Sequence, residues 1–257
     1  MSLSITVHEF PATPGLQLSP FGLKLETWLK MMGLDYDVHW TAQEMGPKGK
    51  VPYATVNGHV LGDSECIIDY ITDQFSVPVP PAFLLSDVEK ARGVMIRRLI
   101  EEHLYFIMVY SRWSDEKNWP GFKEIFFAPA PAFLRGFISK KVRKKVQANL
   151  VAQGIARHTM EEIYKKADID LRALSVLLND NLYFHGNAPT LTDASAYGLL
   201  ANLYYSPVNN TVTDALEKHD NLVAYVKRMK GEFWPQSIRG GGDEASYRHV
   251  VDQQLAS

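Results

Sequence analysis

The sequence predicts a small α/β domain followed by an all-helical domain. Three observations lead to this fold class. The first seventy or so residues are rich in strand and turn signals, the rest of the chain has the pattern of successive helices, and prolines at positions 78, 80 and 81 separate the two parts. Proline neither continues a helix nor sits inside a sheet, so the boundary falls there. We therefore expect a first domain at residues 1–77 and a helical domain at residues 86–257.

The composition is that of an ordinary globular protein and excludes several function classes. The net charge is -2 over 257 residues, which gives no overall excess of positive charge for binding nucleic acid. No apolar run approaches the ~20 residues of a transmembrane helix, and no secretory signal is evident at the start. The only cysteine, Cys66, excludes internal disulfides and multi-cysteine metal sites, and we expect it to be an inert core thiol. The eight histidines lack metal-ligand spacing, so we expect no metal site and a cytoplasmic location.

The first domain begins with a strand and a helix. Residues 5–10 form a plausible strand, ended by Pro11. A helix is expected to start at Ser19-Pro20, because serine is a good N-cap and proline suits the first helical position. Its apolar residues recur at helical spacing as far as Gly33, where glycine is typical of a helix end.

The rest of this domain has the pattern of a strand, a hairpin and a helix. Residues 36–40 form a plausible strand, and residues 53–56 and 59–61 flank Asn57-Gly58, the strongest short hairpin signal. The next helix begins at Asp63-Ser64, two preferred capping residues. The element order is therefore strand, helix, strand, hairpin and helix.

The helical domain opens with a capping box, Ser86 to Glu89, and a long helix through about Tyr110. Residues at helical spacing form one face of that helix: Met95, Leu99, His103, Phe106 and Tyr110. The one dense basic run, Lys140–Lys145, is expected to be the solvated face of an amphipathic helix with Ile138, Val142 and Val146 on its other face. An anionic membrane surface or partner is the alternative, because several phenylalanines precede the run.

This order of elements resembles the glutathione transferases, whose N-terminal domain is thioredoxin-like and whose C-terminal domain is all-helical. Three separated motifs carry the resemblance: Val51-Pro52 just before the hairpin, Asp63-Ser64 at the following helix, and Gly186–Asp193, which looks like the capping box of the family's core helix. The segments 19–29, 49–53 and 153–158 are similar to the failed-axon-connections and metaxin branch. Gly22 stands where relatives with a Pro-Phe-Cys motif carry a thiol, which weakens a glutaredoxin-like interpretation.

The resemblance implies a glutathione site with glutathione as co-substrate. Ser19 would be the catalytic residue, its hydroxyl and the helix start stabilising the thiolate of glutathione. Val51 and Pro52, the proline being cis in this family, would pair with the glutathione backbone. Asp63 and Ser64 would hold the γ-glutamyl end and Lys50 the glycine carboxylate. Each also has a plain structural explanation: Ser19 and Asp63-Ser64 as helix caps, Val51-Pro52 as a surface turn, and Lys50 as a solvated side chain.

The second substrate would bind in the helical domain. His103, Phe106 and Tyr110 are the candidate walls of an electrophile pocket, although each could equally be core between helices. We expect a glutathione transferase-like enzyme whose activated thiol attacks a small apolar electrophile. The alternative is a non-enzymatic, metaxin-like binding or adaptor protein; a disulfide oxidoreductase is disfavoured by the lack of a Cys-X-X-Cys motif. A homodimer is one possible oligomeric state.

Overall fold

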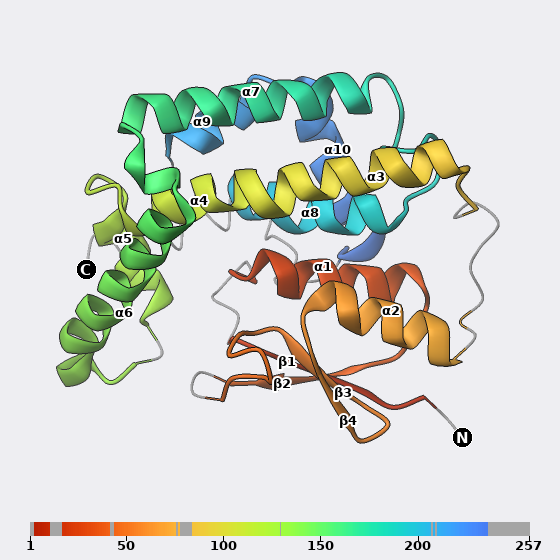
Figure 1. Ribbon diagram of the computed structural model, residues 1–257, viewed down its shortest axis with the longest axis horizontal. Helices are drawn as coiled ribbons and strands as arrows, with labels where there is room; N and C mark the ends of the chain where they lie inside the picture. The colour runs from red at the N-terminus through yellow and green to blue at the C-terminus, as the bar shows by residue number, and fades with distance from the viewer. Residues whose placement is uncertain are drawn as a thin grey trace.

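The computed structural model describes residues 3–10, 17–41, 44–75, 77, 84–128, 130–206, 208 and 210–235. A four-stranded sheet lies at one side of the molecule, helices α1 and α2 cover one of its faces, and the remaining helices are layered beyond them (Figure 1). This is the predicted fold class, a small α/β domain followed by a helical one. The proline linker at 78–81 lies outside the described residues.

The sheet has the strand order β2-β1-β3-β4. The strands are β1 (Ile5–Glu9), β2 (Asp37–Trp40), β3 (Tyr53–Val56) and β4 (His59–Gly62). β1 pairs with β2 in parallel and with β3 in antiparallel orientation. Asn57 and Gly58 connect β3 to β4 with φ angles of 46° and 85°, and glycine and asparagine tolerate such positive angles best in a two-residue turn. The predicted hairpin is confirmed.

Two helices pack on this sheet. α1 (Pro20–Met31) begins after Ser19, and α2 (Ser64–Phe75) begins after Asp63. The apolar positions of both helices recur at helical spacing and pack with residues of β1 and β3, so they form one core that holds the two helix starts in place. The members of that core are Ile5, Val7, Leu25, Trp28, Leu29, Ala54, Val56, Ile67, Ile68, Ile71, Val77 and Ala194.

The helical domain contains a long interrupted helix and six further α-helices among the described residues. α3 (Asp87–Leu99) has the predicted capping box and runs into a π-helical turn (Ile100–Leu104) and then α4 (Tyr105–Trp113). The others are α5 (Trp119–Phe126), α6 (Ala132–Gln153), α7 (Met160–Leu178), α8 (Leu191–Tyr204), α9 (Thr211–Glu217) and α10 (Asp220–Phe233). A short 3-10 turn, Ile155–Arg157, joins α6 to α7.

The two domains meet where α8 crosses α1 (Figure 1). A Cβ atom on Gly198 would lie 2.4 Å from the carbonyl oxygen of Pro20, so only glycine allows this approach. At the start of α8 the buried Asp193 accepts hydrogen bonds from the Thr190 N–H (2.7 Å) and from the Phe184 N–H (3.0 Å). The predicted capping box is confirmed, and it fixes the helix that carries the domain contact.

Candidate functional site

A cleft of about 490 Å³ lies between the sheet domain and the π-helical turn of the helical domain. Five of the sequence-predicted site residues line its N-terminal wall: Lys50, Val51, Pro52, Asp63 and Ser64. The helical wall contributes Arg98, Glu101, Glu102, Tyr105 and Phe106. Residues that are distant in the sequence are therefore gathered around one cavity that is large enough for a small molecule.

Ser19 is the N-cap of α1 and is not among the residues that line this cleft. Its Oγ accepts a hydrogen bond from the Gly22 N–H at 3.1 Å, and Pro20 at the next position has no N–H to offer. Phe21, two residues further on, lines the cleft. Among the described residues no acceptor takes the hydroxyl hydrogen of Ser19, so this group caps the helix and keeps a donor for an incoming anion. The two explanations of Ser19 are compatible.

Two residues of the helical domain hold the segment just before Ser19. Buried Arg112 donates to the carbonyl oxygen of Leu18 at 3.2 Å and to that of Asn202 at 2.8 Å. The side-chain amide of Asn202 in turn donates to the carbonyl of Gln17 at 3.0 Å. Sequence reasoning missed both residues because the partners lie about 90 and 185 positions apart. The only sign of their role in the sequence is that an arginine and an asparagine stand within largely apolar helical segments.

The turn before β3 has the geometry that the resemblance implies. The Val51–Pro52 peptide bond is cis, as expected, and Pro52 is buried while Val51 is partly exposed. Lys50 is exposed at the rim of the cleft. Val51 and Lys50 both line the cleft, so the ammonium group of Lys50 is close enough to the cavity to favour an anionic group there.

Asp63 caps α2 and Ser64 is buried beneath it. The Asp63 Oδ1 accepts from the N–H groups of Glu65 (3.0 Å) and Cys66 (3.3 Å). Its φ angle is +82°, an unusual conformation for a residue other than glycine, which is found where the surroundings or a function require it. The capping explanation of Asp63 is thus correct. Asp63 is also one of the residues that line the cleft.

Cys66 corrects one expectation, because it is exposed. The buried positions of α2 are Ser64, Ile67, Ile68 and Ile71, and position 66 lies on the opposite side of the helix from that stripe. The Cys66 sulfur is 3.3 Å from the Nζ atom of Lys48, another residue of the cleft. This contact raises the pKa of Lys48. The thiol is therefore a surface group beside the cavity and not a core group.

The helical wall differs from the predicted electrophile pocket in two of its three residues. Phe106 lines the cleft, and Tyr105 stands beside it with its ring edge-to-face against Phe21 at 4.9 Å. His103 instead contacts Asp170 of α7 at 2.5 Å, and Tyr110 packs on Tyr164 of the same helix. Neither is among the residues that line the cleft. The π-helical turn at 100–104 adds a residue to the turn and shifts the face that follows.

Tyr105 is one of four residues of this wall that the sequence did not single out. Removal from water raises the pKa of its hydroxyl above the ordinary value near 10. The hydroxyl is therefore fully protonated at neutral pH and can donate a hydrogen bond to a ligand. Tyr105 is the first residue of α4, directly after the π-helical turn.

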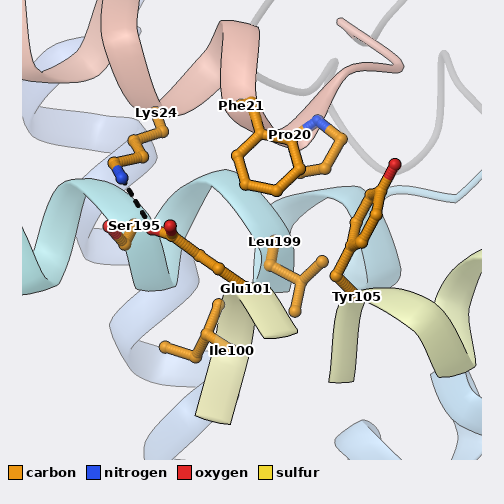
Figure 2. Close-up of a pocket in the computed structure, with 8 residues that line it drawn as sticks. All are labelled: Pro20, Phe21, Lys24, Ile100, Glu101, Tyr105, Ser195 and Leu199. Carbon is orange, nitrogen blue, oxygen red and sulfur yellow. Dashed lines mark hydrogen bonds and ion pairs between the residues drawn. The ribbon is translucent and has the colours of Figure 1, made fainter. Parts of the chain in front are cut away.

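Ion pairs between charged side chains connect the two domains beside the cleft. The Nζ atom of Lys24 lies 2.7 Å from Glu101 Oε1, and both groups are buried (Figure 2). Glu65 binds Arg97 (3.1 Å) and Arg98 (3.2 Å) across the interface. Burial alone would raise the pKa of Glu65, but the positive charges of these partners and of Lys24 lower it overall. These carboxylates are neutralised within the protein and hold the two walls together.

The remaining charges determine what the cleft can accept. Lys48 and Lys50 offer positive charge along its N-terminal wall, while Glu102 and Asp63 offer negative charge. Phe106, Phe21 and Tyr105 form the apolar part. The arrangement suits a small molecule that carries anionic and cationic groups and an apolar part. Within the described residues no cluster of three or more His, Cys, Asp or Glu could hold a metal ion.

Comparison with known proteins agrees with this architecture. The model of the glutathione S-transferase N-terminal domain matches residues 20–118, and the model of the C-terminal domain matches residues 167–229. A glutathione S-transferase of Methylobacterium radiotolerans, solved with glutathione sulfonate, superposes with a TM-score of 0.58 at 16% identity, covering 92% of this chain and 95% of that one. At this identity the likeness concerns the fold.

The curated relatives include one that is named as a transferase and others whose names state no activity. Failed axon connections of Drosophila melanogaster is 31% identical over 90% of this chain, which spans 58% of that protein's length. An isoprene-epoxide glutathione S-transferase of a Rhodococcus strain is 27% identical, covering 89% of this chain and 99% of that protein. Human metaxin-2 is 24% identical, covering 85% of this chain and 83% of that protein. The chain belongs to the glutathione S-transferase family and is similar to its failed-axon-connections and metaxin members.

Proposed function

We propose that the protein is a glutathione transferase that activates the thiol of glutathione for attack on a small apolar electrophile. The family and the fold support a transferase-like function, and the finer statement is supported above all by Ser19. This residue stands at the start of α1, its hydroxyl hydrogen has no acceptor among the described residues, and the adjoining cleft contains the cis Val51–Pro52 turn and Ser64.

The proposed binding mode uses both ends of the N-terminal wall. Glutathione carries two carboxylates and one ammonium group. Ser64 and the first turn of α2 would receive the γ-glutamyl carboxylate, since a helix N-terminus attracts negative charge. The backbone of Val51 would pair with the cysteinyl residue, and Lys50 would face the glycine carboxylate. The thiol then lies toward Ser19.

The chemical step needs a thiolate, and a free thiol has a pKa of ~8.5. Lowering that value by ~2 units requires about 2.7 kcal/mol of preference for the anion. A hydroxyl donor and the N–H groups at the start of α1 are suited to supply it. The thiol proton leaves to water, the sulfur forms a bond to carbon, and the electron pair of the broken carbon bond leaves with the departing group, or with the oxygen when an epoxide opens. Phe106 and Tyr105 would hold the electrophile.

The test compares the parent with Ser19→Ala and with Ser86→Ala. Ser86 is the N-cap of α3, is exposed, and does not line the cleft, so it controls for the loss of a capping serine. Ser19→Ala should reduce the conjugation rate at neutral pH by ~10- to 1000-fold, as the loss of one donor to an anion typically does, while the affinity for glutathione changes little. The thiolate absorbance of bound glutathione should titrate at higher pH in Ser19→Ala only.

Two results would contradict the proposal. Identical thiolate titrations in the parent and Ser19→Ala would leave Ser19 as a helix cap alone. A parent whose thermal midpoint does not rise in millimolar glutathione does not bind it in the folded state, and the adaptor alternative, suggested by the similarity to metaxin-2 and Failed axon connections, would then be preferred.

A further inference from the structure

Helix α6 (Ala132–Gln153) carries a pattern that the glutathione site does not use. Its 22 residues include six lysines and arginines and no acidic residue, although the whole chain has a net charge of -2. With α5, the helix stands at one end of the molecule (Figure 1), and no residue of α6 is among those that line the cleft. The basic run that the sequence analysis singled out therefore lies on a projecting element.

The inner face of α6 is fully used in packing. Ile138, Val142 and Val146 pack against a cluster around Trp113. Arg143 also points inward: its guanidinium group donates to the Trp113 carbonyl at 2.8 Å and lies over the Trp119 ring at 4.6 Å. The predicted amphipathic helix is confirmed, and this packing fixes which face of α6 is turned outward.

The outer face combines exposed aromatic rings with lysines. The Phe133 and Phe137 side chains are 84% and 71% exposed, and Lys140, Lys141 and Lys144 are exposed as well. Their spacing of 4, 7, 8 and 11 residues from Phe133 places all five on one side of an α-helix. None of the three lysines has an ion-pair partner among the described residues. We call these five residues the α6 outer face.

We propose that the α6 outer face docks on an anionic lipid membrane. Exposed phenyl rings have no hydrogen-bonding groups and are stabilised by entering the boundary between headgroups and acyl chains, while lysines on the same face lie at the level of the anionic headgroups. This is the charge complementarity that favours lipid over a second copy of the chain, whose identical face would bring like charges together. The projecting position of α6 lets the face reach a surface without a clash from the sheet domain.

The binding should depend on both halves of the face. The 257-residue chain is mixed with vesicles of phosphatidylcholine alone or with 30% phosphatidylserine, and bound protein is measured by sedimentation. We expect at least tenfold stronger binding to the anionic vesicles. Neutralising Lys140, Lys141 and Lys144 together by Lys→Gln should weaken it by about 100-fold, since each lysine near an anionic surface contributes about fivefold. The double variant Phe133→Ser and Phe137→Ser should weaken it at least tenfold.

Matched control variants lie on α7. Val176 is 69% exposed and Lys165 is exposed. Val176→Ser therefore replaces an exposed apolar side chain and Lys165→Gln removes an exposed positive charge on another helix, and both should leave vesicle binding unchanged. Thermal midpoints and glutathione-induced shifts of all variants report on folding and on the cleft, which has no lining residue from α6. Because all the substituted side chains are exposed, the variants should fold like the parent.

Several outcomes would overturn the proposal. These are equal binding to neutral and anionic vesicles, no vesicle binding, and vesicle binding that the control variants reduce as much as the α6 variants do. Sedimentation at increasing protein concentration detects self-association, and a dimer that the Phe133 and Phe137 changes dissociate would assign the face to a second copy. Binding of RNA with no binding of vesicles would assign it to a nucleic acid.

Discussion

The two walls of the cleft are built in different ways. The N-terminal wall takes its residues from places where the chain changes element: the start of α1, the turn before β3 and the start of α2. The helical wall takes Tyr105 and Phe106 from the middle of one long helical run, just after a π-helical turn. The first kind of site depends on caps and turns that a few neighbouring residues specify. The second depends on helical register, which one extra residue in a turn alters.

The largest expected effect tests the connection between the two walls. Arg112→Leu removes a buried guanidinium group that donates to the carbonyls of Leu18 and Asn202, and leaves those acceptors without partners. We expect the free energy of unfolding to fall by about 3 kcal/mol. Conjugation activity per folded molecule should fall as well, because Leu18 adjoins Ser19.

The exposed Arg157 provides the control for this change, since it also donates to a main-chain carbonyl, that of Val151, at 3.0 Å. Arg157→Leu should cost less than about 1 kcal/mol. Urea unfolding of both variants measures the difference. Equal unfolding midpoints for Arg112→Leu and the parent would mean that the α1 start does not depend on the helical domain.

A second prediction concerns the pH dependence of the helix that packs on α1. Burial raises the pKa of Asp193 to about 6. The folded state therefore holds this proton more tightly than the unfolded chain, where the pKa is near 3.9. The resulting stabilisation is present below pH ~4 and is lost as the pH rises through about 6, by about 3 kcal/mol in total.

The variant Asp193→Asn does not titrate, so its stability should lack this component of the pH profile. Chemical unfolding of both proteins at several pH values between 4 and 7 gives the slope of the unfolding free energy against pH for each. Comparing these slopes makes the result independent of how much the substitution itself destabilises the protein. Parallel slopes for parent and variant would mean that the hydrogen bonds from Phe184 and Thr190 keep the pKa of Asp193 at its ordinary value.

A smaller effect separates the two roles of Asp63. Asparagine caps helices as well as aspartate does, so Asp63→Asn should keep the stability of the parent and reduce glutathione affinity by about tenfold through loss of charge. Asp63→Ala should lose the same affinity and also about 1 kcal/mol of stability. Calorimetric titration with thermal unfolding measures both quantities. Unchanged affinity in folded Asp63→Asn would limit this residue to capping.

Much of the N-terminal wall could be predicted from the sequence because its signals are local. Ser19-Pro20, Asn57-Gly58 and Asp63-Ser64 each specify a helix start or a turn within a few residues, and the structure has them there. The expectation that Cys66 is buried is wrong, because the isoleucines that follow it in the sequence face the core while position 66 faces solvent. Arg112 and Asn202 could not be assigned, since their partners are brought near only by the packing of α8 on α1.

The helical wall could not be predicted correctly, because its lining residues depend on helical register. A period of 3.6 residues carried through Met95 and Leu99 predicts that His103, Phe106 and Tyr110 share one face. The π-helical turn at Ile100–Leu104 breaks that period, and nothing in the local composition marks it. Lys24 bonds to Glu101 within the turn at 2.7 Å (Figure 2), so a contact from the other domain accompanies the irregular register.

The smallest predicted effect tests this shift in register directly, with two aromatic residues that lie four positions apart. Phe106 lines the cleft, whereas Tyr110 packs on Tyr164. Phe106→Ala should raise the KM for an apolar electrophile by about fivefold, the equivalent of about 1 kcal/mol of lost apolar contact, with the KM for glutathione unchanged. Tyr110→Ala should change both KM values by less than about twofold, although it lowers stability. Steady-state rates with each substrate varied in turn give the four constants. A larger effect of Tyr110→Ala on the electrophile would mean that the unbroken helical period describes the working pocket better than the π-helical turn does.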